Sequence, residues 1–239
     1  MDPSTSIKPE PNKNNNKSNE QYDEPFLYYE IGGFSFSTAT LLLGIRILDG
    51  YKLQILLTVY GFFIGGLGQL ITGIMCFKYN HYMDGTTNFF FALNWGINTV
   101  FDLMERYEGV PILGNRERGF HNLMCCFFTF SFFLQMLKDP SHLTKIAFGA
   151  TFLSFVFSTI GAFKGSKGMT KTAGVFCCIT GVLAFYTTFA SLINTRYQKV
   201  YVPTLDGNEF GKKIGDENES ENKLKILNES RKKLDITES

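Results

Sequence analysis

The chain has 239 residues and a formal net charge of +1, from 23 Lys and Arg against 22 Asp and Glu. This balance argues against nucleic-acid binding, for which a basic excess is typical. The charges are unevenly distributed: 9 of the 45 lie in residues 1–30, 18 in residues 195–239, and only 18 in the 164 residues between. A long apolar centre between two polar tails excludes an ordinary soluble domain.

Both tails, residues 1–24 and 204–239, are predicted to be disordered. They are rich in Asn, Lys, Glu and Ser, and they have too little apolar surface to offset the entropy of ordering. The first 30 residues contain no apolar core of a secretory signal, so we expect the first hydrophobic segment to act as its own insertion signal. The predicted organisation is a membrane domain over residues 25–203 between the two tails.

The central region is predicted to cross a lipid bilayer six times. A helix needs about 20 apolar residues to span a hydrocarbon layer of ~30 Å, and runs of roughly this length with few or no charged residues recur along the chain. The runs are 31–45, 53–77, 85–101, 119–137, 146–163 and 172–195. They do not alternate as barrel strands would, and helices satisfy their backbone groups internally. We therefore predict an all-α membrane protein with six transmembrane helices, rather than a soluble helical bundle.

Six crossings place both termini on the same side of the membrane. Lys and Arg are distributed almost evenly between the two sides, so the positive-inside rule barely decides which side is cytosolic. Cytosolic termini are predicted because a long N-terminal tail without a signal is hard to translocate. We expect a multi-pass protein of the plasma membrane, with Arg46 extending from the end of the first helix to the interface.

The second predicted helix carries a smooth face and one amide. Residues at steps of four lie on one side of a helix, and here they are Gly61, Gly65, Gln69 and Gly73. Glycines in such a row let a neighbouring helix come close, and Gly66 widens the surface, so we predict helix packing at these glycines. The carboxamide of Gln69 needs partners at this depth, either across a helix interface or along a wet path.

The third predicted helix is polar where lipid would not tolerate it. Asn94, Asn98 and Asp102 are spaced by four in line with Phe91, and Asn88 adds another amide. Such residues usually face a bundle interior or a water-filled cavity. The later helices add Ser and Thr, so the interior is expected to offer uncharged hydrogen-bond donors and almost no ionised groups. This pattern suits the passage of a small neutral or singly charged solute, and interhelical hydrogen bonding explains it equally well.

No enzyme chemistry is predicted. The sequence has no Gly-rich phosphate loop, no HExxH motif and no G-x-S-x-G elbow. The cysteines all lie in apolar runs, and neither their odd number nor their adjacent pairs fit a disulfide framework or a zinc site. They are Cys76, Cys125, Cys126, Cys177 and Cys178. We therefore expect a protein without a cofactor or a metal.

Residues 62–95 contain a longer pattern: an aromatic stretch, G-G-x-x-Q-x-x-x-G, a short loop, and then Thr, an aromatic residue and Trp. Its positions are Gly65, Gly66, Gln69, Gly73, Thr86, Phe91 and Trp95. This run resembles the acetate uptake transporter family, also called succinate–acetate permeases, and no gap is needed to match it. The resemblance covers about residues 25–203. It implies six transmembrane helices and uptake of acetate and related short carboxylates by hexamers with a path through each protomer.

The resemblance also implies a hydrophobic narrow point in each path. Phe34 matches the aromatic residue that the family places on the first helix, and Phe91 matches the one on the third helix. The family's leucine on the fifth helix falls at Ala150 or Thr151. The family's N-terminal motif, N-P-x-P-L-G-L, is reduced here to EPFLYYE at residues 24–30. The narrow point is therefore implied on two of its three sides.

The predicted function is a transporter or channel for acetate and related small monocarboxylates, passive or proton-coupled. An anion loses hydration at an apolar constriction, so hydrogen-bond donors are expected beside it. The predicted donors are Thr38, Gln69, Asn88 and Asn94, and the predicted constriction is Phe34 and Phe91. The expected partners are the carboxylate, the lipid bilayer and further copies of the chain, with no nucleic acid. Two alternatives stay open: a non-transporting sensor or scaffold on the same fold, and a channel for ammonia or another small neutral solute.

Overall fold

The computed structural model describes residues 27–49, 54–109, 113–138, 141–197 and 200–203, and all regular elements of this part are helices. In chain order they are α1 (Leu27–Leu48), α2 (Gln54–Tyr60), the π-helix η1 (Gly61–Gly68), α3 (Gln69–Lys78), α4 (Tyr82–Glu108), α5 (Asn115–Met136), α6 (His142–Lys164) and α7 (Lys167–Tyr197). The predicted helical fold is confirmed over this part of the chain. The tails predicted to be disordered, residues 1–24 and 204–239, lie outside the described residues.

The described helices form six rods, because α2, η1 and α3 follow one another without a break. Each rod coincides closely with one predicted apolar run. Four rods are long and apolar enough to cross a membrane, namely Tyr28–Leu48, Gln54–Lys78, His142–Lys164 and Lys167–Tyr197. The other two rods, α4 and α5, carry more polar and charged side chains. The described residues thus contain four candidate spans where the sequence led us to expect six.

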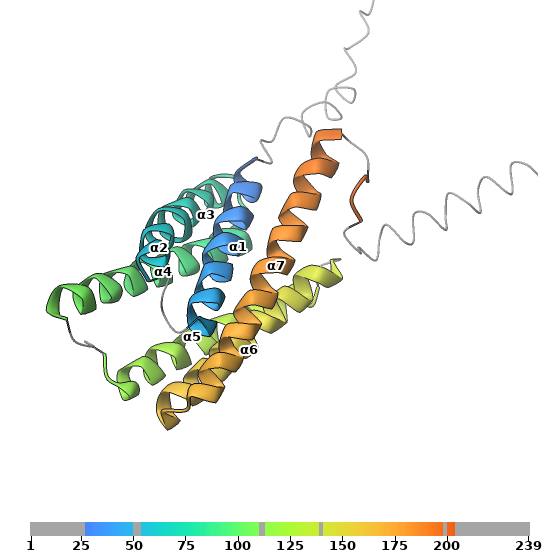
Figure 1. Ribbon diagram of the computed structural model, residues 1–239. Coiled ribbons are helices and arrows are strands. Elements are labelled where there is room, and N and C mark those ends of the chain that lie inside the picture. The colour runs from blue at the N-terminus through green and yellow to red at the C-terminus, as the bar shows by residue number, and fades with distance from the viewer. Residues whose placement is uncertain (1–26, 50–53, 110–112, 139–140, 198–199, 204–239) are drawn as a thin grey trace, which may run out of the picture.

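Local signals set the ends of several helices. α4 ends where Gly109 has a φ of 68°, and α6 ends where Gly165 has a φ of 60°, a left-handed conformation that glycine adopts at little steric cost. α6 begins after Ser141, whose hydroxyl oxygen accepts a hydrogen bond from Thr144 N at 3.3 Å. The connections between α4 and α7 are short, so consecutive rods turn back on one another (Figure 1).

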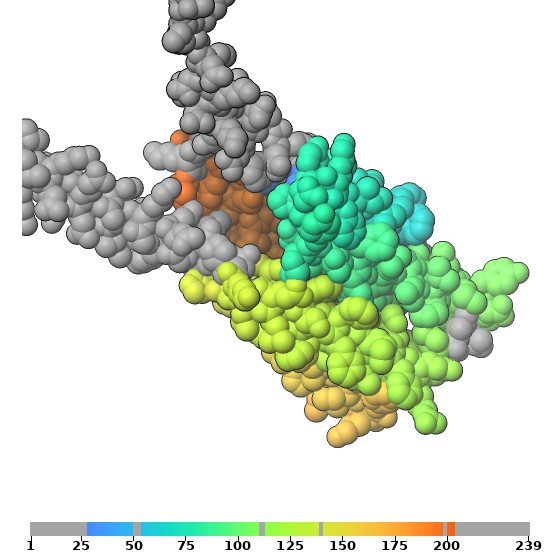
Figure 2. Space-filling view, turned by 180° about the vertical axis from the view of Figure 1, so that it is seen from behind, coloured from blue at the N-terminus to red at the C-terminus, as the bar shows by residue number. Residues whose placement is uncertain are grey.

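α1 packs against α7 on one side and against the rod formed by η1 and α3 on the other (Figure 1). Small residues bring α1 and α7 close together. A Cβ added at Gly44 would lie 2.8 Å from the carbonyl oxygen of Gly174, and one at Gly181 would lie 2.7 Å from the Cβ of Leu41. α6 packs against both α5 and α7. Seen from behind, α3, α4, α5 and α6 follow one another across one face of the bundle (Figure 2).

The glycine row of the second rod receives Trp95 of α4. Much of the row lies in η1, and π-helical turns are frequent at functional sites. A Cβ at Gly65 would lie 2.7 Å from Trp95 Cγ, and one at Gly61 would lie 3.2 Å from the same indole. A Cβ at Gly73 would lie 3.2 Å from backbone atoms of α4, whereas one at Gly66 would meet α4 only at 3.9 Å. The second rod and α4 therefore approach most closely where a larger side chain would not fit.

Candidate functional site

A cavity of about 640 Å³ lies mainly between α1, α4, α5, α6 and α7. α1, α4 and α6 line it with their C-terminal halves, whereas α5 and α7 line it with their N-terminal halves. These halves meet at one end of the bundle. On α4 the lining extends from Phe91 to Glu105, a distance of about 21 Å at 1.5 Å per residue. The length of the cavity is therefore about two-thirds of the thickness of a ~30 Å hydrocarbon layer.

The outer part of the cavity is charged. Its ionisable wall residues are Arg46, Asp102, Glu105, Arg118, His121, Lys167 and Lys171. Four cationic side chains and two carboxylates, with a neutral histidine, give the described wall a net charge of +2. The expectation of an interior with almost no ionised groups is wrong, because charged residues at the helix ends and beside the loops face inward. A net positive wall raises the local concentration of anions.

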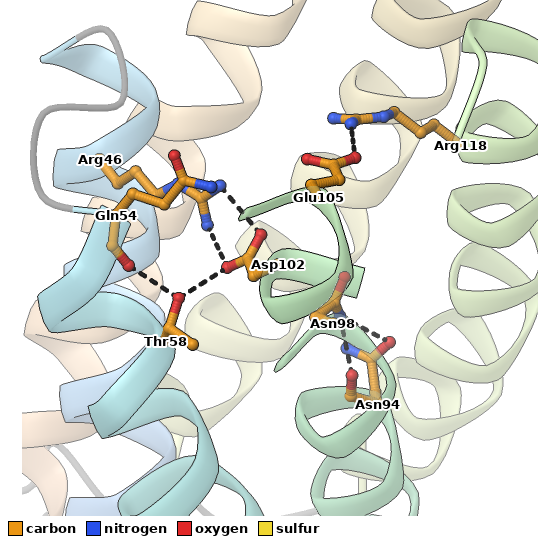
Figure 3. A network of polar contacts seen from close by, with 8 residues as sticks. All are labelled: Arg46, Gln54, Thr58, Asn94, Asn98, Asp102, Glu105 and Arg118. Atoms are coloured by element: carbon orange, nitrogen blue, oxygen red, sulfur yellow. Dashed lines mark hydrogen bonds and ion pairs between the residues drawn. The ribbon is translucent and has the colours of Figure 1, made fainter. Parts of the chain in front are cut away.

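Arg46 and Asp102 form an ion pair with two hydrogen bonds in this wall (Figure 3). Arg46 Nη1 donates to Asp102 Oδ2 at 2.8 Å, and Nη2 donates to Oδ1 at 3.1 Å, the parallel geometry in which a guanidinium holds a carboxylate best. Thr58 Oγ donates to the same Oδ2 at 3.2 Å. Arg46 is only 8% exposed. The prediction that Arg46 extends to the interface is wrong, since a carboxylate on another helix compensates its burial.

A second ion pair lies about one turn further along α4 (Figure 3). Glu105 accepts a hydrogen bond from Arg118 Nη2 of α5, and Arg118 Nε donates to the carbonyl oxygen of Leu113 at 3.1 Å. The Arg118 side chain is 39% exposed, against 10% for that of Arg46. The second pair is therefore better solvated and weaker. Together the two pairs connect α4 to α1 and α5 around the outer part of the cavity.

Further in, the wall carries amides and hydroxyls. Asn98 Nδ2 donates to the carbonyl oxygen of Asn94 at 2.8 Å (Figure 3), and the Cys125 thiol donates to Asn94 Oδ1 at 3.3 Å. Between α5 and α6, Asn122 Nδ2 donates to Ser158 Oγ at 3.1 Å. The polar line predicted on the third helix thus faces the cavity. This part of the wall can hydrogen-bond water or a small solute without a fixed charge.

Aromatic rings border the inner end of the cavity. Phe36 of α1 and Phe91 of α4 line it, and their ring centroids are 4.9 Å apart. Phe148 of α6 stacks on Phe36 with centroids 6.4 Å apart, and the Phe132 ring of α5 lies 6.3 Å from that of Phe91. Four helices thus contribute one ring each to an aromatic layer. Such centroid separations are typical of favourable aromatic pairs, and an apolar constriction of this kind can block hydrated ions.

The structure brings two of the six predicted path residues to the cavity. Phe91 and Asn94 line it. The residues away from the described cavity wall are Phe34, Thr38, Gln69 and Asn88. Phe34 makes an edge-to-face contact with Phe185 of α7, with centroids 5.2 Å apart, and Asn88 Nδ2 donates to a carbonyl oxygen of its own helix at 2.9 Å. Their role beside a solute path stays a prediction.

Gln69 is fully buried, with 0% of its surface exposed. Neither its Oε1 nor its Nε2 has a hydrogen-bond partner among the described residues. Its neighbours on the same rod contact α1: Thr72 Oγ donates to the carbonyl oxygen of Tyr28 at 3.1 Å, and a Cβ at Gly68 would meet Ser35 Oγ. A buried polar group without a partner destabilises a protein by about 1–3 kcal/mol. A water molecule or a solute beside Gln69 would therefore stabilise the bundle.

The face of α1 that lines the cavity does not follow from the family pattern. Besides Arg46, it consists of Phe36, Thr40, Leu43 and Ile47. Steps of four, three and four along a helix mark one face, so residue spacing contains a signal for it. The family pattern indicates Phe34 instead. Because Phe34 precedes Phe36 by two residues, it lies about 200° around the helix and faces a different neighbour.

Residues 19–206 match the GPR1/FUN34/yaaH family. The chain belongs to this family. The succinate-acetate/proton symporter SatP of Escherichia coli (strain K12) is 24% identical to it over 173 residues, which are 72% of this chain and 92% of the relative. The ammonia transport outward protein 2 of Saccharomyces cerevisiae is 26% identical over 181 residues, which are 72% of this chain and 62% of the relative.

The fold is similar to that of a solved structure, the bacterial acetate channel SatP. The two share a TM-score of 0.70 and 20% identity over 74% of this chain and 97% of that chain. The resemblance seen in the sequence is thus confirmed at the level of family and fold. Together with the apolar helices, it identifies the chain as an integral membrane protein of a transport family.

Proposed function

We propose that this protein is a transporter or channel for acetate and related small monocarboxylates. The observation that carries the proposal is the cavity, with its charged outer wall, its amides and hydroxyls further in, and its aromatic inner end. A small carboxylate needs cationic attraction to enter, hydrogen-bond donors as it loses water, and a narrow apolar region that excludes larger solutes. Membership of the family and the names of the bacterial relatives support the same solute class.

In this proposal the membrane domain spans residues 25–203 and crosses the bilayer six times. α4 and α5 have polar faces toward the cavity, but they expose Leu93, Ile97 and Phe127 elsewhere. This division supports helices that face a wet cavity on one side and lipid or another protomer on the other. The proposed location is the plasma membrane with both termini in the cytosol. The proposed assembly is a homo-oligomer, by the family resemblance a hexamer.

The proposed path continues beyond the aromatic layer toward the other end of the bundle. Phe36 and Phe91 form its constriction, and Asn94 serves as a hydrogen-bond donor on the cavity side. Gln69 and Asn88 serve as donors on the far side. The buried amide of Gln69, which has no partner among the described residues, supports this assignment, because its hydrogen-bonding groups are available to a solute or to water.

Ammonia is a second candidate solute, and one observation favours it. The yeast relative is named as an ammonia transport protein. Neutral ammonia needs no cation at the wall, whereas a net charge of +2 on the wall repels ammonium. The charge of the cavity therefore favours a carboxylate over ammonium, and competition between acetate and ammonia separates the two solutes.

Uptake of labelled acetate into liposomes that contain the purified full chain tests the proposal. Protein-free liposomes of the same lipids are the control, because acetic acid crosses lipid unaided. We expect a saturable, protein-dependent component with which other short monocarboxylates compete. Protein-dependent flux of methylammonium that acetate does not inhibit would favour ammonia. Absence of protein-dependent flux of either solute would favour a sensor or scaffold.

A further inference from the structure

We propose that Arg46 and Asp102 form a proton-dependent binding site for carboxylates, in which the substrate replaces Asp102 on the guanidinium of Arg46. This inference rests on the proposed function and specifies how the cavity wall binds the solute. Arg46 already holds one carboxylate, that of Asp102, through hydrogen bonds of 2.8 and 3.1 Å. The planar fork of the guanidinium matches any carboxylate of this shape. The same two donors therefore fit the carboxylate of a small acid.

The ion pair lies where a solute in the cavity reaches it. Arg46 and Asp102 both line the cavity, and their side chains are 10% and 15% exposed. Asn98 and Asn94 continue the wall inward along α4 from Asp102 (Figure 3). Shelter from bulk water strengthens the interaction between a guanidinium and an anion. Contact with the cavity still allows an incoming carboxylate to compete for it.

The exchange requires one proton. While Asp102 is ionised it occupies Arg46, and a second carboxylate there would place two negative charges side by side. When a proton binds to Oδ2 of Asp102, the Arg46 Nη–H groups are released and donate to the two oxygens of the incoming carboxylate. One proton and one anion bind together, so the net charge of the site does not change. When the anion leaves, Asp102 loses its proton and pairs with Arg46 again.

Thr58 supplies the acceptor that a protonated Asp102 needs. Its single O–H has two acceptors within reach, the carbonyl oxygen of Gln54 at 2.8 Å and Asp102 Oδ2 at 3.2 Å, and the shorter contact is the one to Gln54. When Asp102 is protonated, the hydroxyl continues to donate to Gln54 while its oxygen accepts the hydrogen bond from the acid O–H. The acid O–H of a protonated Asp102 thus has an acceptor, so protonation does not leave a buried donor unpaired.

Other charged groups on the wall face the same space as Asp102, and they define the controls. They are Arg46 from α1, Glu105 from α4, Arg118 and His121 from α5, and Lys167 and Lys171 from α7. α2 contributes Thr58 and Gln54 to this network, and the described wall residues of α6 include no titratable side chain. Glu105 and His121 are therefore the competing proton-binding groups.

Acetate binding to the purified full chain, measured as a thermal shift between about pH 5.5 and 8, tests the site. This readout is independent of the permeation of acetic acid through lipid. The affinity of the wild-type protein is expected to weaken about tenfold per pH unit, because each anion binds with one proton. Asp102→Asn should bind acetate without this dependence, because a neutral amide at this position neither takes up a proton nor places a negative charge beside the incoming carboxylate. Arg46→Gln should weaken binding about tenfold or more.

Glu105→Gln and His121→Asn are the matched controls, because each removes another proton-binding group from the same wall. Both should keep the wild-type pH slope, whatever their effect on the affinity itself. The exchange is overturned if the affinity of the wild-type protein does not change with pH. It is also overturned if Asp102→Asn keeps the wild-type pH slope, or if either control loses that slope.

A second variant keeps the test decisive where Asp102→Asn does not fold. Arg46→Lys retains the positive charge but loses the fork, so it should bind acetate more weakly and keep the pH slope. Unchanged affinity in Arg46→Lys overturns the site. A wild-type protein that transports acetate without the pH slope contradicts this inference alone. A wild-type protein that neither binds nor transports acetate contradicts the proposed function as well.

Discussion

Replacement of Gly65 by Ala is expected to destabilise the bundle, because the new methyl group would collide with Trp95. The added Cβ would lie 2.7 Å from Trp95 Cγ and 2.9 Å from Cδ1 and Cδ2, whereas carbon atoms pack best at about 3.5–4.0 Å. The indole or the helix must therefore move by roughly 0.8 Å. Trp95 is 5% exposed, and overpacking of this kind destabilises by about 1–3 kcal/mol.

Gly96 on α4 offers a matched control, because a Cβ there would meet nothing within 4 Å. Exchange of Gly for Ala improves helix propensity by about 1 kcal/mol at either position. The difference between Gly65→Ala and Gly96→Ala therefore isolates the collision with Trp95. At about 2–4 °C per kcal/mol, the melting temperature of Gly65→Ala should lie roughly 2–12 °C below that of Gly96→Ala.

Circular dichroism of the detergent-purified chain measures these melting temperatures. Trp95 is the single tryptophan of the chain, so fluorescence emission reports separately on its surroundings and should shift in Gly65→Ala. The penalty of Gly65→Ala should also shrink in a Trp95→Leu background, where the ring is absent. Equal melting temperatures for Gly65→Ala and Gly96→Ala, or an unchanged penalty in the Trp95→Leu background, would refute the reasoning.

Phe36→Ala should increase acetate flux into liposomes and admit longer carboxylates, whereas Phe34→Ala should change flux less because that ring packs on α7; the opposite order would place the constriction at Phe34. Lys171→Gln should slow acetate uptake about twofold at low salt, since a unit charge at ~10 Å is worth about 0.4 kcal/mol in water, and salt of ~1 M should remove the effect. Lys145→Gln is the control, because Lys145 lies away from the cavity wall, and it should not change acetate uptake. Slower uptake in both variants would argue against local attraction of acetate by the charged wall. Gln69→Leu should keep or raise the melting temperature, because it removes two buried polar atoms that have no partner among the described residues. The same variant should reduce acetate flux, and flux at the wild-type level would exclude Gln69 from the path.

The polar face of α4 is visible in the sequence because residues spaced by four share one side of a helix. Asn94 and Asn98 do lie on the cavity wall. The helical rods are visible as well, because apolar runs of this length have few other solutions. The π-helix from Gly61 to Gly68 is not, because the glycine row is equally compatible with an ordinary α-helix that packs closely on its neighbour.

The pairing of Arg46 with Asp102 cannot be read from the sequence, because the two residues are 56 positions apart and only the packing of α1 near α4 joins them. An arginine at the end of an apolar run ordinarily extends to the interface. Here a carboxylate on another helix overrides that preference. Phe36 is missed for a different reason: the family pattern directs attention to Phe34, and only the neighbouring helices decide which face of α1 borders the cavity.

Cysteine accessibility at Asn98 tests most directly whether the cavity is a wet passage that holds the carboxylate. Asn98→Cys protein in liposomes is treated with a charged, membrane-impermeant thiol reagent, and peptide mass spectrometry distinguishes this site from the native cysteines. Leu93→Cys on the same helix is the control, because Leu93 is 53% exposed on the outer surface of the described bundle. A wet, substrate-holding cavity predicts labelling at position 98 that acetate slows, and no labelling at position 93. Absence of labelling at position 98, or labelling that saturating acetate leaves unchanged, would contradict it.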